Sequence, residues 1–137
     1  LQYALGSSLA YGNVQNAYGH FITPSLSSLS SAASAVPAVF PVNGSMSFAS
    51  VGAPLNLLLN STNADAAYPI TSYTYIIVNQ NLGVVHGMTL KKALALKAFL
   101  LWAVNEGQAY ALGLSYVTLP ASVRALDDAT IGSIYFA

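Results

Sequence analysis

Residues 73–78, Tyr-Thr-Tyr-Ile-Ile-Val, form a run in which nearly every side chain is aromatic or β-branched. Such side chains fit a pleated, largely buried surface better than a helix, so the run predicts a strand. Pro69 has no backbone N–H to donate to a neighbouring strand, and it biases Tyr68 towards extended geometry. The paired part of this strand is therefore expected to begin near Ile70.

The amino-terminal part of the chain predicts a helix or turn followed by a hairpin. Residues 9–16 alternate loosely between apolar and polar side chains, and residues 20–22, His-Phe-Ile, form a second short run. The turn residues Asn16 and Gly19 lie between the two runs, which we expect to pair. Further along, residues 45–51 are interpreted as a strand and residues 60–67 as a polar surface loop.

A short helix is predicted over residues 25–35, where apolar side chains recur at spacings of three and four. Thr23 is the expected N-cap and Pro24 the expected first helical residue. Such a helix carries a single apolar stripe and has one side to bury.

A longer helix is predicted over residues 90–104, after Thr89 as N-cap. Its large apolar side chains go most of the way round a helical wheel, interrupted by three lysines, so both sides need cover. Residues 108–114 suggest another helical turn or two, residues 116–119 an extended stretch, and residues 121–134 a terminal helix. Together these elements predict one α/β domain whose sheet is flanked by helices.

Charge is scarce in this chain: only 6% of its residues are charged, four basic and four acidic, while 55% are apolar or aromatic. The hydrophobic content is too high for disorder, so the chain is expected to fold. No charged face is available for nucleic acid or anionic lipid. The longest strongly apolar run, residues 93–104, is shorter than the roughly 20 residues that span a bilayer.

The surface must therefore be built from uncharged polar side chains and tyrosines. Two N-x-S/T sequons occur, at Asn43 and Asn60, and both are candidate N-glycosylation sites. Sequons and low charge together favour an extracytoplasmic protein, periplasmic, secreted or at the cell surface. There is no cysteine, so the redox compartment stays open. The chain begins at Leu1 without a signal peptide, which suggests a processed chain or a fragment.

No catalytic or metal-binding constellation stands out. His20 and His86 are far apart in sequence and lack the carboxylates that would complete a metal shell. Asp127 and Asp128 are adjacent, so on a helix they point about 100° apart, and we expect them on a solvated helix face. No serine lies in a G-x-S-x-G turn. We therefore expect no enzyme, no cofactor and no metal.

Four motifs in order resemble the carboxyl-terminal part of the phosphate-binding proteins that serve ABC-type phosphate importers. The strand region matches the family's D-A-[YW]-P-I-[ST]-x-x-T-[YF]-I-L-[IV] pattern, with one extra residue between Asp65 and Tyr68. Each motif is short, and their order is what makes the likeness specific. The segments that carry it are residues 65–78, 99–102 (FLLW), 107–108 (GQ) and 114–123 (LSYVTLPASV), preceded by Tyr11, Asn16, Gly19 and residues 23–25 (TPS).

This resemblance implies a portion of a two-lobed, periplasmic-binding-protein-like fold that closes on its ligand by hinge motion. Residues 1–67 would be part of the second lobe, and residues 68–137 would return towards the first. In the family, phosphate is held mainly by the earlier part, so its ligands would precede Leu1 and no binding residue is carried over. The implied partners are inorganic phosphate, through that upstream part, and the permease of an ABC transporter.

An alternative from a different class is an extracellular structural or filament-forming subunit that reuses this portion of the fold. Its basis is the near absence of charge and the apolar coverage on both sides of the helix over residues 90–104. Those surfaces need either a complementary amino-terminal chain or neighbouring copies to bury them.

Overall fold

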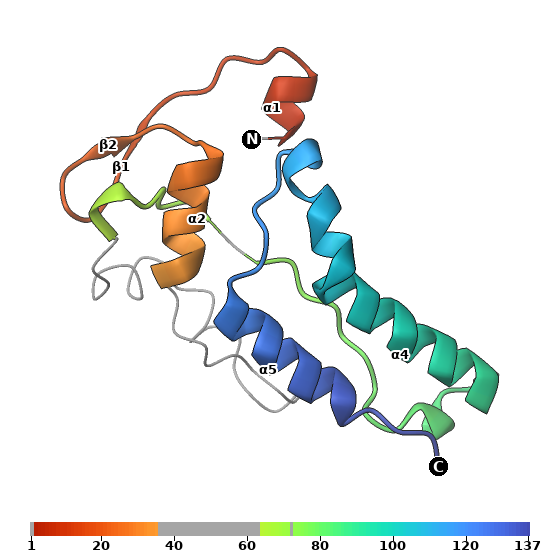
Figure 1. Cartoon of the computed structure of the whole chain (residues 1–137). Coiled ribbons are helices and arrows are strands. Elements are labelled where there is room, and N and C mark those ends of the chain that lie inside the picture. The colour runs from red at the N-terminus through yellow and green to blue at the C-terminus, as the bar shows by residue number, and fades with distance from the viewer. Residues whose placement is uncertain (1, 36–63, 72) are drawn as a thin grey trace.

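The computed structural model of this protein describes residues 2–35, 64–71 and 73–137. It combines helices with one small sheet (Figure 1). Asn43, Asn60 and the strand expected over residues 45–51 lie outside the described residues. The elements are α1 (Gln2–Gly6), β1 (Val14–Gln15), β2 (Phe21–Ile22), α2 (Leu26–Ala35), the 3₁₀ helices η2 (Ala64–Ala66) and η3 (Leu82–Val84), α4 (Leu90–Val104), the 3₁₀ helices η4 (Glu106–Tyr110) and η5 (Leu112–Leu114), and α5 (Ala121–Gly132).

The expected hairpin is confirmed. Strands β1 and β2 pair antiparallel, with Val14 opposite Ile22. Asn16, which is buried, organises the turn: its Oδ1 accepts hydrogen bonds from the amides of Tyr18 and His20, both at 3.0 Å. Its Nδ2 donates to the carbonyl oxygen of Asp65 at 2.8 Å. One amide side chain therefore both shapes the hairpin turn and attaches it to η2.

Helix α2 begins two residues later than the sequence suggests. Ser25, not Thr23, occupies the N-cap position: its Oγ accepts from the amide of Ser28 at 3.1 Å, and the Oγ of Ser28 accepts from the amide of Ser25 at 2.9 Å. This reciprocal pair satisfies two amides that a helix start would leave free. Thr23 instead donates through its hydroxyl to Asn13 Oδ1 at 2.7 Å. The prediction of Thr23 as cap was wrong because a better-placed hydroxyl competes for the same role.

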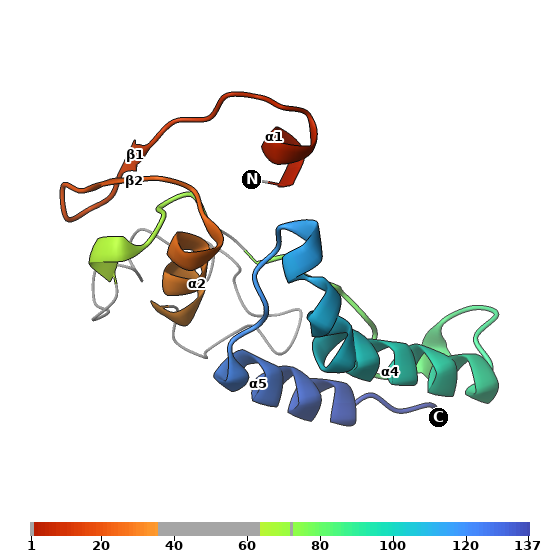
Figure 2. The ribbon, with the colours of Figure 1, turned by 45° about the horizontal axis from the view of Figure 1, so that its top comes forward.

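The strand predicted over residues 73–78 is absent from the described part of the chain: these residues form neither helix nor strand. They run past the α4–α5 pair as a single trace (Figures 1 and 2). Ile76 is 66% exposed and Ile77 is 84% exposed. A strand needs a neighbour to accept its ladder hydrogen bonds, and the described residues provide none beside this segment. The residue types fit a strand, whereas no pairing strand is found for it among residues 2–35, 64–71 and 73–137.

Helix α4 follows the sequence prediction at both ends, from Leu90 to Val104, and Thr89 Oγ1 caps it by accepting from the amide of Lys92 at 3.3 Å. It packs against α5 along one side, where Ala93 and Leu100 are buried. The terminal helix α5 stops at Gly132 and not at residue 134. The helical turns expected over residues 108–114 are the two 3₁₀ helices η4 and η5.

The carboxyl-terminal residues return to the start of η3. Asn81 and Tyr135 form an isolated parallel bridge, and the amide of Leu82 donates to the carbonyl of Tyr135 at 2.8 Å. Leu82 is almost fully buried there. Within the described residues the fold is thus a mixture of helices with one small sheet, and that sheet is limited to two short strands. No helix in this part of the structure is long and apolar enough to cross a membrane.

Candidate functional site

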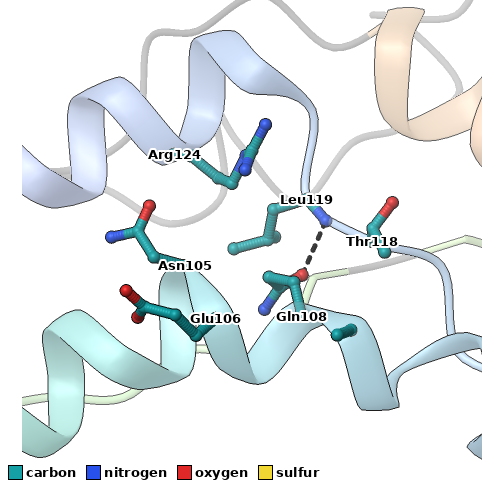
Figure 3. Close-up of a pocket in the computed structure, with 7 residues that line it drawn as sticks. Asn105, Glu106, Gln108, Thr118, Leu119 and Arg124 are labelled. Carbon is teal, nitrogen blue, oxygen red and sulfur yellow. Dashed lines mark hydrogen bonds between the residues drawn. The ribbon is translucent and has the colours of Figure 1, made fainter.

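A hollow of about 310 Å³ lies where the end of α4 and η4 meet the start of α5 (Figure 3). Three chain segments form it: the turn after α4, the extended stretch before α5, and the first turns of α5 itself. The lining combines a cation, an anion, two amides and one hydroxyl with apolar surface. Its residues are Asn105, Glu106, Gln108, Ala109, Thr118, Leu119 and Arg124.

Asn105 fixes one wall of the hollow. It is the C-cap of α4 and lies outside helical geometry, at φ −115° and ψ −96°. Its Nδ2 donates to the carbonyl of Leu101 at 3.1 Å, which satisfies an acceptor that the helix end would leave free. The same Nδ2 donates to Asp128 Oδ1 at 2.8 Å. The cap of α4 is therefore also a link to α5.

Gln108 holds the extended stretch against the 3₁₀ helix. Its Nε2 donates to the carbonyl of Ala103 at 2.7 Å, and its Oε1 accepts from the amide of Leu119 at 2.8 Å (Figure 3). Both ends of the side-chain amide are thus committed to backbone groups from two different segments. These two bonds give a structural reason for the Gln of the family motif Gly-Gln, which the sequence has at residues 107–108.

The glycine at position 107 is needed for a steric reason. A Cβ added there would lie 3.0 Å from the carbonyl oxygen of Trp102 and 3.2 Å from its ring. The chain turns closely over the indole, and a side chain at this position would push the turn away. The Gly-Gln pair therefore sets both the path of the turn and its attachment to the stretch before α5.

Arg124 supplies the cation of the hollow from the second turn of α5. Its Nε is buried and has no hydrogen-bond partner in the described structure. Glu106 lines the same hollow from the opposite side, and its carboxylate points away from the guanidinium (Figure 3). The sequence predicts no role for Arg124, because a lone arginine without a motif carries no signal in one sequence.

The sequence predicts that the acidic pair on α5 lies on a solvated face, and this prediction was wrong. Asp127 and Asp128 are both partly buried. Burial raises the pKa of Asp127, and the neighbouring Asp128 raises it further. Burial, followed by Tyr75 and Asp127, raises the pKa of Tyr73 to about 12. The Tyr73 hydroxyl donates to the carbonyl of Ala33 at 2.8 Å, which links this cluster to α2.

A second surface feature is the side of α4 that faces away from α5. Leu94, Phe99 and Trp102 are 60%, 55% and 46% exposed there. The rings of Phe99 and Trp102 stack with centroids 6.0 Å apart, and Trp102 meets Tyr110 at 6.2 Å. We call Leu94, Phe99, Trp102 and Tyr110 the apolar ridge. A contiguous exposed group of large apolar side chains is typical of an interaction surface.

The two histidines are not brought together into a site. His20 lies at the hairpin with its Nδ1 3.3 Å from the carbonyl of Asp65, and His86 is exposed ahead of α4. Across residues 2–35, 64–71 and 73–137, no group of three or more metal-ligating side chains is present.

Comparison with known proteins finds relatives that share one name. The Methanocaldococcus jannaschii protein named phosphate-binding protein PstS is 34% identical over 127 residues, which cover 92% of this chain and 31% of that protein. A Xylella fastidiosa protein of the same name is 32% identical over 90% of this chain and 29% of its own length. A Haemophilus influenzae protein, again so named, is 31% identical over 88% of this chain. No family model and no solved structure matches.

These matches place the chain among the relatives of solute-binding proteins. Within that class it is similar to the phosphate-binding proteins, of which it matches a carboxyl-terminal portion, so the resemblance stated from the motifs is confirmed. The chain spans about three-tenths of the length of these relatives. Their names describe binding proteins and not enzymes.

Proposed function

We propose that this chain is the carboxyl-terminal portion of an extracytoplasmic phosphate-binding protein that delivers phosphate to an ABC transporter permease. The observation that carries the proposal is the match along 92% of the chain to a relative named for phosphate binding. In this proposal phosphate is held mainly by upstream residues, and the described residues serve as scaffold. Residues 1–67 would belong to the second lobe and residues 68–137 would return to the first.

The exposed apolar surface supports a scaffold role for these residues and a ligand-binding role for upstream residues. Ile76 and Ile77 have strand-forming side chains but stand open to solvent, and the apolar ridge on α4 is uncovered. Burying such side chains contributes about 1.5–3 kcal/mol each, so a chain that leaves them exposed gains from a covering partner. Upstream polypeptide of the length found in the relatives would supply that cover and a strand to pair with residues 73–78.

Isothermal calorimetry with inorganic phosphate tests the proposal on two proteins. The 137-residue chain should give no heat of specific binding, whereas a protein of the relatives' full length that ends in this sequence should bind phosphate saturably. Sulfate is the matched control anion. Saturable phosphate binding by the 137-residue chain would place ligands within it, and no binding by the long protein would refute the phosphate assignment.

Location and glycan attachment form a separate part of the proposal. We expect the native protein outside the cytoplasm, with Asn43 and Asn60 as candidate glycan sites. Mass spectrometry of the native protein, isolated from a known cell fraction, reports any sequence upstream of Leu1 and any added mass on the two asparagines. A native cytoplasmic protein with unmodified sequons would contradict this part.

A self-associating structural subunit is the second candidate, and the apolar ridge is the observation that favours it. If copies cover one another's ridges, light scattering of the 137-residue chain should show large particles that dissociate when Trp102 and Phe99 become serine. A monodisperse monomer would exclude this candidate and leave the complementary upstream chain as the cover.

A further inference from the structure

We propose that the carboxyl group of Asp127, on α5, makes this fold more stable in acid than at neutral pH, which suits the chain to acidic surroundings. The supporting observations are the number and position of the titratable side chains, the acceptors that the lysines use, and the partial burial of the acidic pair on α5. None of them involves a phosphate ligand, so this property is independent of phosphate binding.

Most folded proteins lose stability in acid, and the causes are known. Carboxylates that are paired or hydrogen-bonded in the folded state must take up a proton, and histidines buried in their neutral form must become charged. A large net positive charge adds repulsion within the compact state. A chain with few groups of these kinds therefore has little stability to lose as the pH falls.

This chain has few such groups. It has four acidic side chains, of which Asp65 and Glu106 are exposed. Its two histidines, His20 and His86, are also exposed, so they need no burial of a charge when they are protonated. The sequence places all of its acidic, basic and histidine side chains within the described residues. In acid, the positively charged side chains are only the four basic residues and the two histidines.

Two lysines of α4 bind acceptors that do not titrate. The ammonium group of Lys97 donates to the carbonyl oxygens of Gly132 and Ile134, at 2.8 and 2.9 Å. The ammonium group of Lys92 donates to the carbonyl oxygen of Gly87 at 2.8 Å. A carboxylate loses its charge in acid, whereas a backbone carbonyl remains an acceptor. The bonds that Lys97 makes between α4 and α5 should therefore persist in acid.

The acidic pair Asp127 and Asp128 is partly buried, unlike the other two acidic side chains. Asn105 Nδ2 donates to Asp128 Oδ1 at 2.8 Å, so a neutral amide faces that carboxylate. Burial, followed by the charge of Asp128, raises the pKa of Asp127. Arg124 lies one turn earlier on α5, and Tyr73 interacts electrostatically with Asp127 from the segment that precedes η3.

Charged groups from the elements packed against α5 complete this environment. From α4, Lys97 binds the last carbonyls of α5. From η4, Glu106 lines the hollow that Arg124 also lines. Glu106 adds a further negative charge near α5, which disfavours an ionised carboxyl there in the same way as Asp128 does.

The sign of the pH effect follows from the direction of the pKa shift. Because the pKa of Asp127 is raised on folding, the folded chain holds a proton at a pH where the unfolded chain has released it. This stabilisation is complete below the ordinary value of 3.8 and is lost as the pH rises through the raised value. The free energy of unfolding should therefore increase as a neutral solution is made acidic.

Urea denaturation of the 137-residue chain tests this expectation at pH 7 and at about pH 4, close to the ordinary pKa of an aspartate. The buffers contain no phosphate and have equal ionic strength. We expect the urea midpoint to be higher at the acidic pH. An equal or lower midpoint in acid would overturn the proposal.

Two variants assign the effect to one side chain. Asp127→Asn has a neutral side chain of similar shape at both pH values, so we expect its midpoint at pH 7 to rise towards the acidic midpoint of the parent. The difference between the two pH values should shrink accordingly. Glu106→Gln makes the equivalent change at an exposed carboxylate and should keep the parent's difference. If Asp127→Asn keeps that difference as well, the proposal fails.

Nuclear magnetic resonance gives a second measurement that does not require a variant to fold. The chain has three aspartates, so the carboxyl carbon signals of their side chains can be followed separately as the pH is lowered. The Asp127 signal should titrate with a midpoint above 3.8, and a midpoint at or below that value would overturn the proposal. Phosphate calorimetry tests the proposed function separately, so the failure of one leaves the other intact.

Discussion

The ammonium group of Lys97, on α4, donates to the carbonyl oxygen of Gly132 at the end of α5, at 2.8 Å. It also donates to the carbonyl of Ile134 at 2.9 Å. The last carbonyls of a helix lack intrahelical partners and carry partial negative charge, so a cation stabilises them. Among three lysines on one helix, this one joins the two helices that form the hollow.

We therefore expect Lys97→Met to lower the free energy of unfolding by about 1–2 kcal/mol, the range of a partly exposed bond to a charged donor. The variant retains the apolar stem of the side chain, so the loss in unfolding free energy measures the contribution of the ammonium group. Lys91→Met is the matched control, because Lys91 is exposed and its ammonium makes no such bond to the described residues. Urea denaturation measures both, and equal effects would refute the bridging role.

Gln108→Leu should destabilise the chain by about 1–3 kcal/mol, because it leaves the amide of Leu119 without its acceptor in a partly buried position. Gln80→Leu makes the same chemical change at an exposed residue whose bond, to Ser133 Oγ at 3.3 Å, is longer. We expect that control within about 0.5 kcal/mol of the parent. Hydrogen exchange at the Leu119 amide gives an independent measure, which should accelerate in Gln108→Leu.

Gly83→Ala should separate the carboxyl-terminal residues from η3. An added Cβ would collide with the carbonyl oxygen of Ala137, so residues 135–137 must shift and the bond between the Leu82 amide and the Tyr135 carbonyl weakens. We expect faster exchange of the Leu82 amide. Gly113→Ala is the control, since a Cβ there meets nothing within 4 Å. Equal exchange in both variants would contradict this packing.

Alkaline pH should weaken the fold through Tyr73. Its pKa is about 12 in the folded chain against 10.0 for the free phenol, so between pH 10 and pH 12 the unfolded state releases a proton that the folded state keeps. The stabilisation is complete below pH 10 and is lost as pH rises towards 12. Tyr73→Phe should reduce the slope with which the free energy of unfolding falls between pH 10 and pH 12, although it also removes the bond to Ala33. Tyr110→Phe, at an exposed tyrosine, is the control. An unchanged slope in Tyr73→Phe would contradict the assignment.

Ile77→Ala tests whether residues 73–78 form a buried strand within this chain. Because Ile77 is 84% exposed, we expect its truncation to change the free energy of unfolding by less than about 0.5 kcal/mol. Leu82→Ala, at a residue that is 2% exposed, should cost about 2–5 kcal/mol. A comparable loss for Ile77→Ala would show that the segment is paired in the 137-residue chain.

Local signals in the sequence were sufficient for several elements. Thr89 places a hydroxyl three residues before an amide that needs an acceptor, so α4 begins where the sequence predicts. Asn16 and Gly19 favour the hairpin turn in the same way: the Asn side chain bonds to nearby amides, and Gly19 adopts φ 82°. The family motifs also lie along one stretch of chain, so they were visible without a structure.

The tertiary structure decided what depends on partners from distant positions. Residues 73–78 have the composition of a strand, but pairing depends on a neighbour that the described residues lack. Asp127 and Asp128 are predicted on a solvated face, yet both are partly buried, because burial is set by what packs against a helix. The environment of Arg124 is likewise set by the elements that pack around it. A sequence specifies the guanidinium, whereas only the tertiary structure places Arg124 at the hollow between η4 and α5 and buries its Nε.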